Sequence, residues 1–239
     1  MVDIHTHILN NIDDGSKSLN ESISILKQYE KEKIDKIVLT PHYIENSEYS
    51  VQNEEKRKKF ELLKEEVKRQ NINVELFLAN EVYLSNNILT LLKEDKIMTI
   101  NNSRYLLIEF PMVNEDPNAL NIIYNLKLSG ITPVIAHPER YIYVQENIDK
   151  VLEYINLGAL LQVNKGSLFK KYGKDAYKIV KKLIKRKLVY FIASDVHSMN
   201  GIYSTKKTIK KLKKITSKDY IKEVLEKNGL NVLNNVEIG

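Results

Sequence analysis

The run Thr132-Pro133-Val134-Ile135-Ala136 is apolar over most of its length and is followed directly by His137. A second run of this kind, Lys36-Ile37-Val38-Leu39-Thr40, ends two residues before His42. Such runs favour parallel strands that are buried on both faces of a sheet. A histidine just beyond a buried strand favours chemistry at the carboxyl edge of that sheet. These two stretches therefore predict an α/β protein with its site at the strand ends.

Strand-like and helix-like segments alternate along the whole chain. The predicted strands are residues 2–5, 36–40, 74–79, 104–109, 132–136, 159–163 and 188–193. The predicted helices are residues 19–32, 52–70, 86–93, 117–128, 146–156 and 169–186, with two more after residue 203. Residues 18–21 predict a capping box at the start of the first helix. Gly130 and Gly158 each stand just before a strand, where the glycine that ends a helix belongs.

Seven strands alternating with helices predict a single domain over residues 1–239. We expect a distorted (β/α) barrel of seven strands, related to the TIM type, and an open doubly wound sheet is the alternative. Candidate site residues decide between them, because they follow several different strands. Convergence of many strand ends is natural for a closed barrel, whereas an open sheet offers one crevice.

All five histidines lie in short motifs that suit metal binding. His5 and His7 form an H-x-H sequence, and alternation along a strand points their side chains the same way. His42 and His137 each follow a strand-like run, and His197 ends the sequence Ser-Asp-Val-His. Neutral imidazole is the commonest metal ligand among side chains. The five motifs together predict a site for more than one metal ion.

Acidic residues at equivalent positions complete this candidate site, namely Asp14, Glu81, Glu109 and Asp195. A carboxylate placed directly after a buried strand is costly unless it is paired or bound to a cation. Either glutamate taken alone fits an ordinary solvated loop equally well. Mixed histidine and carboxylate ligands favour manganese, iron or zinc over magnesium or calcium.

Arg140 is the candidate for binding a phosphoryl group, because a guanidinium can hold two phosphoryl oxygens at once. The alternative for Arg140 is a surface ion pair with Glu139. Metal ions beside an anion site can orient a phosphate and activate a water for in-line attack, without a protein nucleophile. The chain contains no cysteine, which excludes disulfides, thiolate metal sites and cysteine nucleophiles.

The net charge of +6 is unevenly distributed, since residues 121–239 hold 22 Lys and Arg against 10 Asp and Glu. This basic half favours an anionic substrate or partner, and solvated helix faces in a lysine-rich protein are the alternative. No apolar run approaches the length of a membrane span, and no signal peptide is visible. We expect a cytoplasmic protein without membrane insertion.

Seven segments, in order along nearly the whole chain, resemble the polymerase and histidinol phosphatase (PHP) superfamily. Within it they resemble the tyrosine-protein phosphatases of bacterial capsule and exopolysaccharide operons. The segments are residues 1–9, 12–15, 40–43, 80–83, 107–110, 136–141 and 194–197. The sequences Ile-Asp-Asp-Gly and His-Pro-Glu-Arg-Tyr are the most specific of these.

The resemblance implies a seven-stranded barrel and a manganese-dependent phosphatase with two or three ions, iron or zinc being the other candidates. It implies a substrate in the phosphotyrosine tail of a bacterial tyrosine autokinase that controls polysaccharide export. By motif, the implied metal ligands are His5, His7, Asp14, His42, Glu81, Glu109, His137, Asp195 and His197. The implied catalytic residues are Arg140, Asp195 and His197.

One departure from the family pattern is visible. The family commonly has a second arginine shortly after its Ser-Asp-x-His motif, but residues 198–203 contain none. Lys206 or Lys207 is the expected substitute for this second arginine, although an ammonium is a point charge and cannot bind two oxygens side by side as a guanidinium does. The competing interpretations are a histidinol-phosphate phosphatase, a nucleic-acid-processing PHP module and an inactive protein that senses the kinase tail. No separate nucleic-acid motif is present, so we do not expect nucleic-acid binding.

Overall fold

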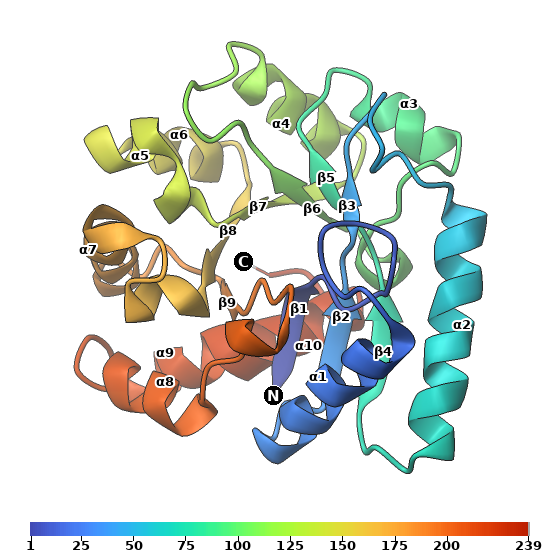
Figure 1. The fold of residues 1–239 in the computed structure, drawn as a ribbon. Coiled ribbons are helices and arrows are strands. Elements are labelled where there is room, and N and C mark those ends of the chain that lie inside the picture. Colours follow the sequence, from blue (N-terminus) through green and yellow to red (C-terminus); the bar gives the residue numbers. More distant parts are fainter. Residues whose placement is uncertain (239) are drawn as a thin grey trace.

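The computed structural model describes residues 1–238, which form an α/β fold of parallel sheets surrounded by helices (Figure 1). The strands are β1 (Val2–Thr6), β2 (Lys36–Leu39), β3 (His42–Tyr43), β4 (Glu75–Leu78), β5 (Glu81–Tyr83), β6 (Tyr105–Glu109), β7 (Thr132–Ala136), β8 (Leu160–Asn164) and β9 (Phe191–Ala193). One sheet has the order β1-β2-β4, and the other has the order β3-β5-β6-β7-β8-β9. Every paired strand is parallel, as the apolar runs predicted.

Two of the predicted strands continue beyond a short break. The run 36–40 resumes after Pro41 as β3, and the run 74–79 resumes after Asn80 as β5, and neither of these two short strands was predicted. Asn80 fills this break, because its Nδ2 donates to the Pro41 carbonyl at 3.0 Å and its Oδ1 accepts from the Met98 amide at 3.1 Å. Each break moves the chain from the three-stranded to the six-stranded sheet, directly at His42 and Glu81.

The segment after β9 lies beside the first strand. The Asp195 amide donates to the His5 carbonyl at 3.0 Å, and the His7 amide donates to the Val196 carbonyl at 2.9 Å. A parallel bridge joins Thr6 to Val196. These bonds connect the two ends of the strand order, while the closed barrel of seven strands stays a prediction.

The helices also follow the predicted order, with shorter limits. They are α1 (Leu19–Lys31), α2 (Asn53–Arg69), α3 (Ile88–Lys93), α4 (Ala119–Leu128), α5 (Ile142–Glu146), α6 (Lys150–Asn156), α7 (Gly173–Lys185), α8 (Thr205–Leu212), α9 (Lys218–Lys222) and α10 (Asn228–Leu233). The predicted helix 146–156 is instead α6, preceded by α5, because the backbone of Asn147 is extended. The predicted helix 169–186 starts late because a 3₁₀ turn fills Lys165–Phe169 and Lys170 is left-handed. No helix within residues 1–238 is both long and apolar enough to cross a membrane.

The predicted helix ends are largely confirmed. Ser18 Oγ accepts a hydrogen bond from the Glu21 amide at 3.2 Å, while the Glu21 carboxylate accepts from Lys17 rather than from Ser18. Only half of the capping box is therefore formed. Gly130 and Gly158 have φ values of 79° and 87° directly after α4 and α6, so a left-handed glycine ends each helix.

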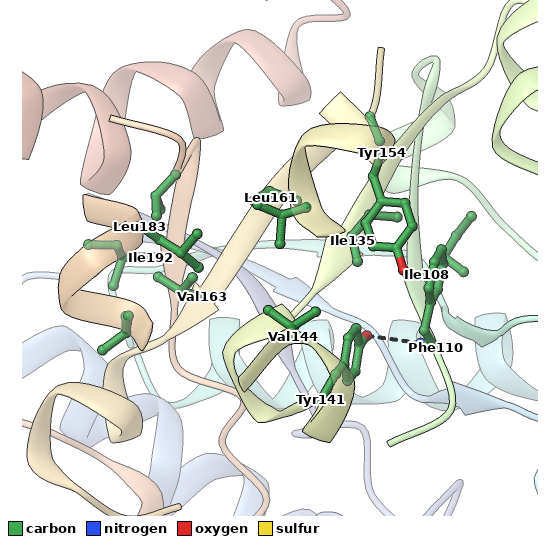
Figure 2. Close-up of a cluster of buried hydrophobic side chains, with 14 of the residues drawn as sticks. Ile108, Phe110, Ile135, Tyr141, Val144, Tyr154, Leu161, Val163, Leu183 and Ile192 are labelled. Atoms are coloured by element: carbon green, nitrogen blue, oxygen red, sulfur yellow. Dashed lines mark hydrogen bonds between the residues drawn. The ribbon is translucent and has the colours of Figure 1, made fainter. Parts of the chain in front are cut away.

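Alternate residues of the strands face two different cores. Ile135 of β7 joins the cluster that packs against the surrounding helices, where Leu161 and Tyr141 also lie (Figure 2). Val134 of the same strand joins a second cluster with Val2 of β1, enclosed between the strands. Full burial of each such side chain contributes roughly 1.5–3 kcal/mol. Because both faces are packed, the strand ends are held rigidly, and a site built on them is well positioned.

Candidate metal centre

The nine predicted metal ligands come together at the carboxyl ends of the strands. Each lies in β1, β3, β5 or β6, or in the segment directly after β1, β7 or β9. Each has an imidazole nitrogen or carboxylate oxygen within 3.8 Å of another member of the set. The structure thus assembles every residue of the set, while their ligand role remains a prediction.

Glu81 lies at the middle of the cluster and is completely buried. Its Oε2 is 3.2 Å from Nε2 of both His5 and His7, and 3.1 Å from Nδ1 of His42. Its Oε1 is 3.0 Å from Nε2 of His137. Glu81 Oε2 and His42 Nδ1 are buried polar atoms without a hydrogen-bond partner. Buried polar atoms are rarely left unpaired, so this position suits a cation.

A second group lies nearer to solvent. Asp14 Oδ1 is 3.3 Å from His197 Nε2 and 3.7 Å from His42 Nε2. Asp195 Oδ1 lies between the two groups, 3.4 Å from His197 Nδ1 and 3.5 Å from His7 Nε2. His197 is the most exposed of these histidines, with 30% of its side chain accessible. The cluster therefore extends from a dry interior to a solvated rim.

Three sets of side chains have ligand atoms within 4.8 Å of one another. They are His7, Asp14, His42 and His197; His5, His7 and Glu81; and His42, Glu81 and Glu109. The sets share members, as expected where one ligand bridges two ions. The mixture of nitrogen and oxygen donors fits manganese, iron or zinc, and the overlap of the sets fits two or three ions.

The electrostatics of the cluster also favour bound cations. Burial and the neighbouring Glu81 raise the pKa of Glu109 to about 8. Burial opposes charge on His7, yet Asp13 and Glu81 hold its pKa well above the usual value. Burial, together with Arg140, lowers the pKa of His137 to about 4, so this imidazole stays neutral and keeps its lone pair. The carboxylates thus attract positive charge, which either protons or metal ions supply.

Two supporting residues were not predicted, although one adjoins a predicted ligand. Asp13 Oδ2 lies 2.6 Å from His7 Nδ1, and the Asp13 carboxylate also accepts from the amides of Gly15 and His42. Gln162 Oε1 lies 2.8 Å from His5 Nδ1. Such partners fix the orientation of a ligating imidazole and raise its basicity. The sequence Ile-Asp-Asp-Gly indicated an acidic loop without showing which aspartate does which task.

Polar residues of β8 form a third support. Gln162 Nε2 donates to Asn164 Oδ1 at 2.9 Å, and Asn164 Nδ2 donates to Asp195 Oδ2 at 2.6 Å. Residues two apart share one face of a strand, so both amides face the site. The signal was present, because these amides interrupt the otherwise apolar strand Leu160–Asn164, but we assigned no site residue there.

Arg140 lies at the edge of the cluster. Its Nη1 donates to Asp195 Oδ2 at 3.1 Å, and its guanidinium lies 4.5 Å from the centre of the Tyr172 ring. The alternative of a surface ion pair with Glu139 is wrong. Glu139 is fully buried and accepts from the Asn164 amide and the Ser167 hydroxyl. Arg140 is therefore free to present its remaining donors to an anion.

A cavity of about 330 Å³ opens over the cluster, and Arg140, Lys171, Tyr172, Ile44 and Tyr83 line it together with seven of the nine predicted ligands. The expected substitutes for a second arginine do not line it. Lys206 borders a different cavity, shared with Lys31 and Lys210, and Lys207 borders neither. The second cationic side chain at this cavity is Lys171, which comes from the segment after β8.

Comparison with known proteins agrees with this geometry. A family model described as "Capsular polysaccharide synthesis, CpsB/CapC" matches residues 1–234. The chain belongs to the CpsB/CapC family. CapC of Staphylococcus aureus is 40% identical over all of this chain and 93% of its own length. The tyrosine-protein phosphatase CpsB of Streptococcus agalactiae is 33% identical, with 84% of each chain covered.

Solved structures give the same result. A structure from work on YwqE of Bacillus subtilis and CpsB of Streptococcus pneumoniae superposes with a TM-score of 0.91, at 27% identity, over 100% of this chain and 96% of that chain. Those proteins are described as metal-dependent tyrosine phosphatases. The resemblance to this group of phosphatases is thus confirmed for the family and for the fold.

Proposed function

We propose that this protein is a metal-dependent phosphatase that hydrolyses phosphotyrosine in proteins, as its CpsB and YwqE relatives are named to do. The observation that carries the proposal is the nine-residue metal centre beside Arg140, under one open cavity. Divalent cations held by the nine ligands would activate a water and offset the negative charge of the phosphoryl group. The absence of cysteine agrees with this route.

The side chains that line the cavity would bind the phosphoryl group and the tyrosine ring of the substrate. Arg140 binds the phosphoryl oxygens and is oriented by Asp195 and by the ring of Tyr172. Lys171 adds positive charge at the opening, while Ile44 and Tyr83 offer an apolar wall for an aromatic ring. His197, one of the nine predicted ligands, is partly exposed and lines the same cavity, so it borders the space where the phosphoryl group binds.

We infer manganese as the resident metal, in two or three ions, because the family resemblance implies manganese and the overlapping sets of nitrogen and oxygen donors are compatible with it. We infer that the substrate is the phosphotyrosine tail of a bacterial tyrosine autokinase in the cytoplasm that controls capsule or exopolysaccharide synthesis, in keeping with the family. We also infer one domain whose strands close into a distorted seven-stranded barrel. The enclosed core and the Thr6–Val196 bridge support that inference.

The test is a comparison of substrates and metals on the purified protein. A phosphotyrosine peptide should be hydrolysed with manganese and not after chelation, and iodoacetamide should have no effect. Histidinol phosphate should be a poor substrate. The reverse preference would identify a histidinol-phosphate phosphatase, and full activity in a preparation shown by elemental analysis to contain no metal would refute the proposal.

A further inference from the structure

A second cavity, rich in lysine, is bordered by residues of α7 and α8 and of the segments next to them, and it shares no lining residue with the cavity over the metal centre. Both helices lie at the left of Figure 1. We call this second cavity the basic cleft, and its volume is about 220 Å³. Its lining residues are Leu168, Tyr177, Lys181, Lys185, Lys211, Lys214 and Ile215. Four of the seven lining residues are thus lysines.

Among the residues that the structure describes, these four lysines have no acidic partner. Within residues 1–238, no carboxylate lies within 4.0 Å of any of their ammonium nitrogens. Helix α8 contains no acidic residue, and Asp175, the one acid of α7, pairs with Lys178. On α2, in contrast, Lys59 and Lys64 each pair with a glutamate. Facing ammonium groups repel one another, so this arrangement does not stabilise the fold and instead attracts an anion.

Aromatic rings hold the lysines at the basic cleft and beside it. Lys170 and Lys181 each lie 5.2 Å from the centre of the Tyr177 ring. Lys211 lies 4.8 Å from the centre of the Phe169 ring. Lys181 and Lys211 are half-buried as whole residues, so part of each side chain is held against the protein. Side chains that are already ordered lose less entropy when they bind an anion, which argues against a merely solvated helix face.

The basic cleft is close to the metal centre along the chain. Leu168 lines the cleft, and Lys171, three residues later, lines the cavity over the metal centre. Three residues of backbone span at most about 11 Å. The two cavities therefore border one short segment of the chain, so a substrate that extends beyond its phosphotyrosine is able to contact both.

We propose that the basic cleft binds an acidic segment of the phosphoprotein substrate, a few residues from the phosphotyrosine that is hydrolysed. This proposal rests on the phosphotyrosine phosphatase function given above. The chemistry recognised is a run of carboxylates or further phosphoryl groups, held by the four lysine ammonium groups. The cleft would raise affinity for such substrates without taking part in the reaction.

The test uses phosphotyrosine peptides that share one core and differ in a flanking run of glutamate, glutamine or phosphoserine, placed on either side. The variant carries four Lys→Gln changes, at Lys181, Lys185, Lys211 and Lys214. The matched control carries four Lys→Gln changes at exposed lysines in the N-terminal half of the chain, namely Lys27, Lys58, Lys68 and Lys93. Metal content and thermal stability are measured for both, since neither set lies in the metal centre.

The cleft variant should raise KM for the glutamate peptide roughly fivefold to tenfold, since several rim ion pairs of modest strength are lost. Its kcat, its KM for the glutamine peptide and its activity on p-nitrophenyl phosphate should not change. The phosphoserine peptide shows whether phosphoryl groups serve as well as carboxylates. High salt should remove the wild-type preference for glutamate.

Equal KM values for glutamate and glutamine peptides in the wild-type enzyme would overturn the proposal. An equal loss in the control variant would also overturn it, because a general charge effect would then suffice. Binding to phosphatidylglycerol vesicles that is lost in the cleft variant, with unchanged peptide KM, would make a membrane the partner instead. No turnover of any phosphotyrosine peptide would refute the phosphatase function itself, which is a different outcome.

Discussion

Arg140 is the residue whose replacement best separates phosphate binding from metal binding. Asp195 keeps hydrogen bonds from Asn164 and Tyr172 when the guanidinium is lost. We therefore expect Arg140→Ala to retain its metal while kcat/KM on a phosphotyrosine peptide falls about 100-fold, the usual cost of one charge-assisted contact in a buried site. Elemental analysis and steady-state kinetics measure the two effects.

The control for this prediction is Arg140→Lys, which keeps the positive charge but loses the paired N–H donors of the guanidinium. It should recover only part of the activity. Unchanged kinetics in Arg140→Ala would remove this arginine from phosphate binding, and loss of metal would show that it serves mainly to position Asp195.

Asp13 is predicted to act on the metals through His7. The carboxylate accepts from the imidazole at 2.6 Å, and His7 holds the pKa of Asp13 below its usual value although burial opposes this. Asp13→Asn keeps the size of the side chain but removes its negative charge, which weakens its hydrogen bond with the His7 imidazole. Manganese affinity should therefore fall roughly 10- to 100-fold. Equilibrium dialysis against manganese measures it. An affinity equal to that of the wild type would show that the backbone alone orients His7.

The residue scale also shows why sequence alone located most of this site. The five histidines are few and each lies in a motif, so their grouping was predictable. Gln162 and Asn164 are amides without a distinctive motif, and their role depends on which ring nitrogen and which carboxylate oxygen they face. That information appears only when β8 pairs with β9 and its side chains meet His5 of β1 and Asp195 after β9.

Among the elements, α2 contacts the residue next to Glu81 through one buried lysine. Lys56 is fully buried, and its Nζ donates to Asn80 Oδ1 at 3.0 Å, at the break between β4 and β5. Burial, together with the nearby Arg57, lowers its pKa to about 7. In the unfolded chain this amine stays protonated to about pH 10.4. The unfolded state therefore binds more protons between these values, and stability rises with pH.

The prediction is a difference between the wild type and Lys56→Met. From about pH 7.5 to 9.5, the unfolding free energy of the wild type should rise by roughly 2 kcal/mol more than that of the variant. Urea unfolding at the two pH values measures it, and Asn80 keeps its bond from Met98 in both proteins. Parallel pH profiles would show that Lys56 keeps an ordinary pKa in the fold.

The strand breaks near Lys56, between β2 and β3 and between β4 and β5, show which elements the sequence could not predict. Apolar runs predicted seven of the nine strands described within residues 1–238, with starts within three residues of those observed, because burial on both faces gives a clear pattern. The short β3 and β5 carry site residues instead of apolar runs, so hydrophobic periodicity could not identify them. Likewise, the division of 146–156 follows from one extended asparagine, a local conformation that helix propensity does not reveal.

At the scale of the whole molecule, the metal centre is a product of the complete fold. Its predicted ligands run from His5 to His197, so the set exists only when the first strand, the middle strands and the segment after β9 are all in place. Metal binding should therefore stabilise the folded chain as a unit, by about 4 kcal/mol at a thousandfold excess over Kd. Chelation should lower the melting temperature, and manganese should restore it.

The pH dependence of that binding follows from the charges in the cluster. Without cations, Glu109 has a pKa of about 8, and the pKa values of His5 and His7 are raised, so these groups hold protons near neutral pH. Each proton must leave before its group can bind a metal. Manganese affinity should then rise with pH by about tenfold per unit for each proton displaced, up to the pKa of Glu109. Calorimetric titration in buffers of different ionisation enthalpy counts the released protons. An affinity that does not change between pH 6 and 8 would mean that these side chains are not the ligands.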